Sequence, residues 1–465
     1  MHRANPISVL CLLWAASFGC SQQAEPRLPN IILLSIDTLR ADHLSCYGAD
    51  QATSPWIDRL AAKGARFVDV ISHSPSTAPS HMSIFTSTYP GVHGVHIRDE
   101  GLRFGRLPEK LQSLPEVLQA QGYRTAAFTG GAQVTAGFGF ERGFEVYKED
   151  MFRLEDQDFD PVLDWLAKVG PDEPFFLFLH TYEVHAPYQP PAPYDTLFDP
   201  DYTGRISGEW NEKEWFDKLM ALRPLDDREV RHLKALYDGE ILYTDQAFSR
   251  FFKTLAEKGL FGNEKTLLIL TSDHGEEFME HGRLAHMQLY QEIMKVPLIF
   301  YWPGVIPEGV VVPGQVRLID LVPTLFDCVG MPAWPQAQGV SLKTWIQAGS
   351  RETLPAFSEN HHQKDERTLR IDDFTYYARG KKGAELYARD MDSGERKNLL
   401  GPGQDRGQYK SITDTLGKAV DAFLMENEKH RNRLGILDAA EGTDDIHSDK
   451  DKDLEERLRT LGYIQ

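Results

Sequence analysis

Three apolar runs, each followed directly by polar side chains, constrain the fold of this chain most strongly. They lie at residues 31–36, 175–179 and 267–270, and the segments between them contain stretches typical of helices. Continuous apolar runs of this length are typical of strands buried on both faces, as in a parallel sheet covered by helices. The alternation therefore predicts an α/β fold with a mostly parallel central sheet between two helical layers.

The polar residues after these runs are candidates for one functional site. Ligands of open α/β sheets bind where the carboxyl ends of the parallel strands meet. We therefore expect Asp37, residues 180–185 and residues 273–286 to lie at the same rim of the sheet.

Composition excludes some classes of function. The 465 residues carry a formal net charge of −19 and are 41% hydrophobic. This charge argues against a nucleic-acid-binding protein, which would present a basic face. It also gives no long-range attraction for an anionic substrate, so a site for an anion must be formed locally by a metal ion, His or Arg.

The first 20 residues predict an export signal. Arg3 precedes an apolar run at residues 7–20, which is too short to span a bilayer and is followed by a polar segment. A short membrane anchor and a buried strand are the alternatives. Cys20 resembles the processing site of a bacterial lipoprotein, which predicts an exported protein of the periplasm or outer cell envelope, held to a membrane by lipid on Cys20.

Asp273, His274 and Asp37 are candidate metal ligands. Asp273 and His274 leave a buried strand together, and Asp37 has the same placement after an earlier strand. Carboxylate oxygen and imidazole nitrogen predict one divalent ion, for which Ca, Mn, Zn and Mg all remain open. The alternatives are a solvated, charge-rich loop at 273–286 and a helix N-cap at Asp37.

A group of hydroxyl side chains precedes a predicted helix near residue 78. Its members are Ser72, Ser74, Ser76, Thr77 and Ser80. Most such hydroxyls cap helices or bond to the backbone. Thr77 lies at the expected helix start, where N–H groups attract anions, and a divalent ion beside it would activate its hydroxyl as a nucleophile.

Several histidines fall in the segments expected to meet at this rim. They are His180, His185 and His286, with Glu183 between the first two. A single histidine is more often structural, but several in converging segments favour binding an anion or protonating a leaving group.

The remaining segments predict accessory parts. Residues 197–236 are polar and rich in Trp, which indicates an insertion or lid near the site. From residue 351 onward the pattern predicts short antiparallel strands, and the tail after about residue 420 predicts a helix, an acidic link and a last amphipathic helix.

Nine segments, in order along the chain, resemble the sulfatase family within the alkaline phosphatase superfamily. They are NIILLSIDTLRADHLSCYG, SPSTAPSHMSIFTSTYPGVHGV, FLHTYEVHAPYQPP, YDGEILYTDQAF, ILTSDHGEEFMEHG, HMQLYQEIMKVPLIFYWPG, DLVPTLFDCVGMP, AELYARDMDSGERKNL and LRTLGYIQ. The resemblance implies an α/β/α sandwich with a small C-terminal α+β subdomain. It implies a signal at 1–20, a catalytic domain at 28–335 and a C-terminal subdomain and tail at 350–465.

The nucleophile motif departs from the family pattern. In family sulfatases a Cys or Ser at this position is oxidised to formylglycine, and an Arg follows four residues later. By the resemblance, Thr77 stands at the formylglycine position and His81 at the Arg position. Because Thr is not a substrate for that oxidation, Thr77 looks like the nucleophile of the phosphodiesterases and phospho-group transferases of the superfamily.

The ligand sets that the resemblance implies differ from the family pattern too. One divalent ion would be held by Asp37, Thr77, Asp273 and His274. His81, His185 and His286 would bind the anion in place of the family's Lys and Arg residues. Histidine cations would make activity pH-sensitive near neutrality.

Three functions follow as hypotheses. The first is a metal-dependent hydrolase of a phosphate or sulfate ester, with phosphodiesters and phosphonates favoured because of Thr77. The second is a sulfuric ester hydrolase of the arylsulfatase type, acting on glycans either through unmodified Thr77 or through a modified Ser76 or Ser80. The third is a catalytically dead surface protein that binds polyanionic glycans or lipids.

Overall fold

The computed structural model describes most of the chain. The described residues are 28–98, 103–151, 153–154, 159–206, 210, 212–361, 365–371 and 373–436. The expected signal at 1–20, the lipid attachment at Cys20 and the last predicted helix lie outside these residues. In the described part of the chain, no helix has the length and apolarity needed to cross a membrane.

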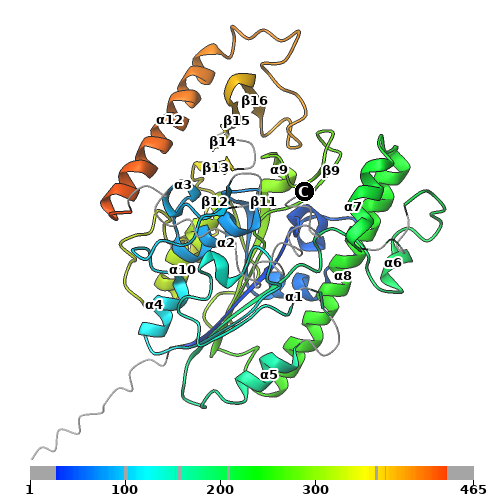
Figure 1. Cartoon of the computed structure of the whole chain (residues 1–465). Helices are drawn as coiled ribbons and strands as arrows, with labels where there is room; N and C mark the ends of the chain where they lie inside the picture. Colours follow the sequence, from blue (N-terminus) through cyan, green and yellow to red (C-terminus); the bar gives the residue numbers. More distant parts are fainter. Residues whose placement is uncertain are drawn as a thin grey trace, which may run out of the picture.

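An eight-stranded sheet forms the centre of the molecule (Figure 1). In spatial order its strands are β12 (Val310–Arg317), β2 (Ala65–Ile71), β11 (Lys295–Tyr301), β8 (Thr266–Thr271), β1 (Asn30–Ile36), β7 (Phe175–Thr181), β5 (Arg124–Phe128) and β6 (Val146–Lys148). Only β11 runs antiparallel to its neighbours within this sheet. The predicted α/β fold with a mostly parallel central sheet is therefore confirmed.

Helices cover both faces of this sheet. They are α1 (Pro55–Lys63), α2 (Thr77–Thr86), α3 (Pro90–His93), α4 (Leu114–Ala120), α5 (Asp160–Leu166), α6 (Tyr194–Leu197), α7 (Glu212–Ala221), α8 (Asp227–Glu257), α9 (Gln291–Met294), α10 (Leu321–Cys328), α11 (Lys343–Ala348) and α12 (Lys410–Arg433), of which α12 belongs to the C-terminal part. Short 3₁₀ turns occupy Ala41–His43, Ser45–Tyr47, Ala136–Phe138, Leu318–Asp320 and Gly380–Lys382.

The side chains of β1 show why two helical layers form. Successive strand residues point to opposite faces. Ile31 and Leu33 share one core with α2, α4, α10 and α11. Ile32 and Leu34 share the other core with α1, α5, α7 and α8. Both sets are fully buried, so the continuous apolar run in the sequence reflects burial on both faces of the strand.

A second, four-stranded antiparallel sheet follows the main sheet. It consists of β13 (Ala356–Asn360), β14 (Glu366–Ile371), β15 (Phe374–Arg379) and β16 (Ala384–Ala388), and α12 packs on it. The predicted antiparallel C-terminal strands are therefore confirmed. Two-stranded hairpins pair β3 (Ile97–Arg98) with β4 (Arg103–Phe104) and β9 (Glu277–Phe278) with β10 (Leu284–Ala285).

The segment expected as an insertion or lid is mostly helical. It contains α7 and the first turns of α8. The Trp215 side chain of α7 is 1% exposed and packs in the hydrophobic core that contains α1, α5 and α8. The Trp-rich composition therefore reflects packing of α7 against the protein.

Candidate active site

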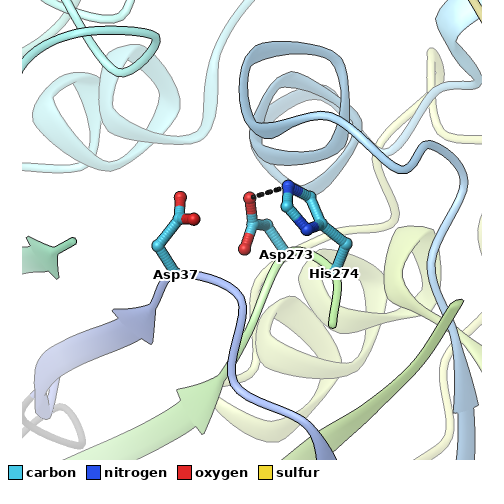
Figure 2. A group of neighbouring side chains, drawn as sticks. All are labelled: Asp37, Asp273 and His274. Carbon is cyan, nitrogen blue, oxygen red and sulfur yellow. Dashed lines mark ion pairs between the residues drawn. The ribbon is translucent and has the colours of Figure 1, made fainter. Parts of the chain in front are cut away.

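Strands β1 and β8 bring the predicted carboxylates together. They are adjacent and parallel, with Ser35 paired to Thr271, so Asp37 and Asp273 both lie two residues beyond paired positions. The ligand atoms of Asp37, Asp273 and His274 all lie within 4.8 Å of one another (Figure 2). The three side chains come from two segments more than 230 residues apart in sequence, as the strand-end pattern predicted.

These three side chains, called here the acidic cluster, are completely buried. Oδ1 of Asp37 and Oδ2 of Asp273 have no hydrogen-bond partner, and in the described residues neither carboxylate forms an ion pair with Lys or Arg. Burial, followed by the charge of Asp273, raises the pKa of Asp37 well above its ordinary value. Burial opposes ionisation of Asp273 as well, but His274 and His81 hold its pKa below the usual range.

This donor set fits a divalent cation. Two orphaned buried carboxylate oxygens require a positive charge, and none of the described Lys or Arg side chains supplies it. Nδ1 of His274 lies 3.0 Å from the carbonyl oxygen of Gly275 and donates to it, so Nε2 keeps its lone pair for a ligand. Oxygen and imidazole donors suit Ca, Mg, Mn and Zn, and the identity of the ion stays open.

Thr77 is the first residue of α2, and its hydroxyl lies against this cluster. Its Oγ1 atom is 3.4 Å from Nε2 of His274. Its hydroxyl also forms hydrogen bonds with Asp37 and with the phenol of Tyr182. The predicted nucleophile therefore lies beside the predicted metal ligands, at the N-terminus of a helix that is buried along its whole length.

The neighbouring serines have other partners. Ser76 donates to Oε1 of Gln133 at 3.1 Å. Ser80 donates to the carbonyl oxygen of Asp273 at 2.8 Å and lies 3.0 Å from Ser72. Ser72 donates in turn to the carbonyl oxygen of Ser74. Much of the hydroxyl-rich sequence therefore fixes the loop and the start of α2, and Thr77 faces the acidic cluster.

His81 lies one turn after Thr77 on α2. Its Nδ1 donates to the carbonyl oxygen of Thr77 at 3.0 Å and is 3.6 Å from Asp273, and its Nε2 accepts from Ser35 at 2.8 Å. Burial lowers the pKa of His81, which favours the neutral ring. Both ring nitrogens therefore connect the helix to the sheet and to Asp273.

His185 and His286 form a pair next to His274. Their ring centroids are 5.2 Å apart, and that of His286 is 4.4 Å from that of His274. Nδ1 of His185 donates to the carbonyl oxygen of Ala186 at 2.6 Å, and Nδ1 of His286 lies 3.3 Å from Glu276. Burial and His286 lower the pKa of His185 to about 3, so this ring is neutral near pH 7 and is not the cation that we expected.

The sequence pattern named His180 among the candidate histidines but assigned no role to Tyr182 and Gln133. His180 lies 3.3 Å from Asp37, Tyr182 contacts Thr77, and Gln133 contacts the residues on both sides of Thr77. Tyr182 lies in the segment already expected at the rim. Gln133 follows β5, and applying the strand-end rule to that strand would have identified it.

Comparisons with known proteins identify the family of this chain. A family model described as sulfatase matches residues 29–331, and one described as the C-terminal part of N-sulphoglucosamine sulphohydrolase matches residues 279–425. The first match covers more than half of the chain, so the chain belongs to the sulfatase family. Sulfatases of this family typically bind a divalent metal.

Curated relatives are distant in sequence. Arylsulfatase K of Mus musculus is 24% identical over 69% of this chain and 64% of its own length. The chain thus spans slightly less than two thirds of that relative. An arylsulfatase of Clostridium perfringens is 23% identical over 86% of this chain and 95% of its own length. The ulvan-active sulfatase of Formosa agariphila is 25% identical over 87% of this chain and 83% of its own length.

Solved structures support the fold. A protein solved with D-glucosamine-2-N,6-O-disulfate has a TM-score of 0.70 and 19% identity, covering 88% of this chain and 99% of its own. The phosphonate monoester hydrolase of Agrobacterium radiobacter has a TM-score of 0.68 and 20% identity, covering 86% of this chain and 96% of its own. Relatives acting on sulfate esters and on phosphonates therefore share this architecture.

Proposed function

We propose that this chain is a metal-dependent hydrolase of sulfate or phosphate esters in which Thr77 is the nucleophile, with phosphodiesters and phosphonates as the favoured substrates. One observation carries the proposal: the Thr77 hydroxyl lies 3.4 Å from Nε2 of His274, within the buried acidic cluster. By its resemblance to the sulfatase family, Thr77 would stand at the position that family sulfatases oxidise to formylglycine. Since Thr cannot be oxidised in that way, direct attack by its alcohol is the chemistry left to this position.

Asp37, Asp273, His274 and the Thr77 hydroxyl would hold the divalent ion. When bound, that ion lowers the pKa of the alcohol and screens the charge of the substrate's oxygens. The two orphaned carboxylate oxygens and the lone pair on His274 support this ligand set.

The reaction then follows from the positions of the side chains. Oγ1 of Thr77 forms a bond to phosphorus or sulfur, and the bond to the leaving alcohol breaks in line with it. The Thr77 proton passes to Asp37, the carboxylate that shares a hydrogen bond with this hydroxyl. Water then attacks the covalent ester on Thr77, Oγ1 leaves and takes back the proton held by Asp37, and the product is a phosphate monoester, a phosphonate or inorganic sulfate according to the substrate.

The histidines have different roles in this proposal. His286 lies next to His274, where it contacts the oxygens of the substrate and protonates the leaving alcohol, while the neutral ring of His185 packs beside it. His81 keeps Thr77 and Asp273 in place, because both of its ring nitrogens already have protein partners. This replaces the direct contact between His81 and the anion that the sequence pattern suggested.

Sulfate ester hydrolysis is the second candidate, because the curated relatives include arylsulfatases and a sulfatase named for ulvan, and a structural relative was solved with a sulfated glucosamine. An anionic glycan ester would then be the substrate. The version of this candidate that uses a modified Ser76 or Ser80 has less support, because those hydroxyls bond to Gln133 and to the carbonyl oxygen of Asp273. A non-catalytic binding protein has the least support, since it does not require the acidic cluster.

The nucleophile is tested by Thr77→Ala. We expect turnover of aryl phosphodiester, phosphonate, phosphate monoester and sulfate substrates to fall by about 10³-fold or more, while Thr77→Ser keeps part of it. The assay compares Mn, Zn, Mg and Ca after removal of metal with a chelator. The substrate that wild-type protein turns over fastest decides between the two ester classes.

The matched control is Thr86→Ala at the other end of α2, where the hydroxyl donates to the carbonyl oxygen of Met82. This variant should lose stability but keep its activity. Full activity of Thr77→Ala, or a formyl group found by mass spectrometry in the peptide 72–88, contradicts the proposed nucleophile.

We also propose that the protein is exported and held to a membrane of the cell envelope through Cys20. The short apolar run and the cysteine at its end support this. An anionic polymer or lipid outside the cytoplasm would then be the accessible source of substrate.

A further inference from the structure

Gln133 contacts the residues on both sides of Thr77, although the sequence analysis assigned it no role. It follows β5, is fully buried, and uses its Oε1 atom to accept two hydrogen bonds. One comes from the Ser76 hydroxyl and the other from the backbone N–H of Ala78, each at 3.1 Å. The amide of Gln133 therefore holds the residues immediately before and after the proposed nucleophile.

The orientation of this amide is fixed by its partners. A backbone N–H can only donate, so the atom facing Ala78 must be the oxygen. The NH₂ group consequently points to the other side. Nε2 is buried and has no hydrogen-bond acceptor among the residues that the structure describes.

Other buried glutamines of this protein satisfy their NH₂ groups. Nε2 of Gln315 donates to the carbonyl oxygens of Leu354 and Arg370 at 2.6 and 3.0 Å. Nε2 of Gln336 donates to those of Thr86 and Gln112 at 3.1 and 2.8 Å. A buried donor without a partner is unfavourable, so such a group is expected to acquire an acceptor when a ligand binds.

A second connection joins Gln133 to the nucleophile. Its backbone N–H donates to the Tyr182 hydroxyl at 3.1 Å, and that hydroxyl forms a hydrogen bond with Thr77. Side-chain and backbone contacts of Gln133 thus surround Thr77. The unpaired NH₂ group therefore belongs to a side chain that is bonded to the residues on both sides of Thr77.

We propose that Gln133 is a catalytic residue that donates a hydrogen bond from Nε2 to a non-bridging oxygen of the sulfate or phosphate group attacked by Thr77. This inference rests on the proposed function of Thr77. The hydrogen bond strengthens as negative charge builds on that oxygen during attack. A neutral amide takes this place in a site whose carboxylates form no ion pair with a described Lys or Arg.

The variant Gln133→Glu tests the donor specifically. It keeps the size of the side chain and an oxygen that accepts from Ala78, but it replaces the NH₂ group by an acceptor. The probes are inorganic phosphate and inorganic sulfate, measured as competitive inhibitors of the best ester substrate. We expect the inhibition constants to rise and kcat to fall by about 10- to 100-fold, the usual effect of losing a hydrogen bond to a charged group. Metal content should stay close to wild type, and the added buried carboxylate should lower the melting temperature.

A second variant and a control separate anion binding from folding. Gln133→Met removes both the donor and the acceptor without adding charge, so the inhibition constants should rise with it too, together with some loss of stability. Gln336→Glu breaks two hydrogen bonds at the far end of α2. It should lower the melting temperature and leave the inhibition constants unchanged.

The outcomes distinguish this inference from the function on which it rests. If wild-type protein is active and both Gln133→Glu and Gln133→Met keep its inhibition constants and kcat, the proposed role of Gln133 is wrong. The proposed role of Thr77 is then unaffected. A metal-loaded wild-type protein that binds neither anion and turns over none of the esters overturns both. If Gln133→Glu does not fold, the inhibition constants of Gln133→Met decide.

Discussion

At the scale of single residues, the chemistry of this site depends on two carboxylates that repel each other. Asp37 and Asp273 are both buried, and each has an oxygen without a hydrogen-bond partner. A charge pair of like sign in a dry environment is unfavourable unless a cation neutralises it. The repulsion between the two carboxylates destabilises the metal-free protein and should therefore give it strong affinity for a divalent ion.

Because of this repulsion, Asp37→Asn should change the stability of the metal-free and the metal-loaded protein in opposite directions. Asp37→Asn removes one of the repelling charges, so the melting temperature of metal-free protein should rise by about 1 °C for each kcal/mol of repulsion removed. In the variant, added Mn or Zn should no longer raise the melting temperature. Thermal unfolding with and without chelator measures both effects.

A suitable control is Asp245→Asn, a buried carboxylate that accepts hydrogen bonds from Trp56 and Ile57 at the start of α1. It should leave the metal-dependent shift unchanged. If Asp37→Asn lowers the melting temperature of metal-free protein as well, repulsion within the acidic cluster is not the dominant effect.

At the scale of secondary-structure elements, helix α2 positions Thr77, the proposed nucleophile, because both ends of the helix are fixed. Its N-terminus is held by Gln133 and by Ser80, which reaches the backbone after β8. Near its C-terminal end, Ser87 donates to the carbonyl oxygen of Ile319, and Gln336 donates to that of Thr86. All of its residues are buried, so the position of Thr77 is set by the whole of the surrounding core.

His73, in the loop before α2, predicts a pH dependence of stability. Its Nδ1 donates to the carbonyl oxygen of Phe357 at 2.8 Å, and its Nε2 accepts from the N–H of Ile319 at 3.3 Å. Only the neutral ring can do both. Burial accordingly lowers the pKa of His73 from 6.5 to about 3.

The sign of the effect follows from this depressed pKa. Above pH 6.5 the ring is neutral in folded and unfolded chains, and its contribution to stability is fully present. As the pH falls from 6.5 to about 3, the unfolded chain binds the proton and the contribution is lost. Each pH unit in this window should cost about 1.4 kcal/mol.

The measurement is the free energy of unfolding in urea at pH 7.0, 5.5 and 4.5, for wild type and His73→Gln. The glutamine can donate and accept but does not titrate. The slope with pH should be smaller in the variant, by about one proton. Parallel slopes would show that His73 is not responsible for the loss of stability in acid.

At the scale of the whole molecule, the C-terminal sheet and the main sheet share a core. Ile71 and Met294 of the main sheet region pack with Ala356, Tyr377 and Tyr387 of the C-terminal sheet. Arg389 also pairs with Asp69 of β2 at 2.5 Å. This shared core indicates that the main sheet and the C-terminal sheet fold together. The domain limits at 335 and 350 stay predictions.

The proposed membrane attachment belongs to this scale as well. When the full chain is expressed in a bacterial host, it should sediment with the membrane fraction and become soluble only in detergent. Cys20→Ser should appear in the soluble fraction with the same activity, because residue 20 lies outside the predicted catalytic domain. Membrane attachment of Cys20→Ser equal to that of wild type would contradict lipid on this cysteine.

The amino-acid sequence was enough to predict the central sheet and the meeting of Asp37 with Asp273 at its rim. Buried parallel strands require continuous apolar runs, and their ends are read directly from the residues that follow. Asp37 and Asp273 could therefore be placed together, since β1 and β8 are adjacent and in register. The prediction that Thr77 is the nucleophile came from its place at the start of a helix and from the resemblance to the sulfatase family.

Only the tertiary structure decided which polar side chains face the site. The rotation of α2 directs Thr77 toward His274 and Ser80 toward the backbone of Asp273. The contact of His81 with Ser35 and the contact of Gln133 with Ala78 join segments 46 and 55 residues apart. Such contacts depend on how loops and helices pack across the sheet, which the local pattern of a chain does not encode. The protonation of the histidines was decided in the same way, because burial in the folded molecule sets it.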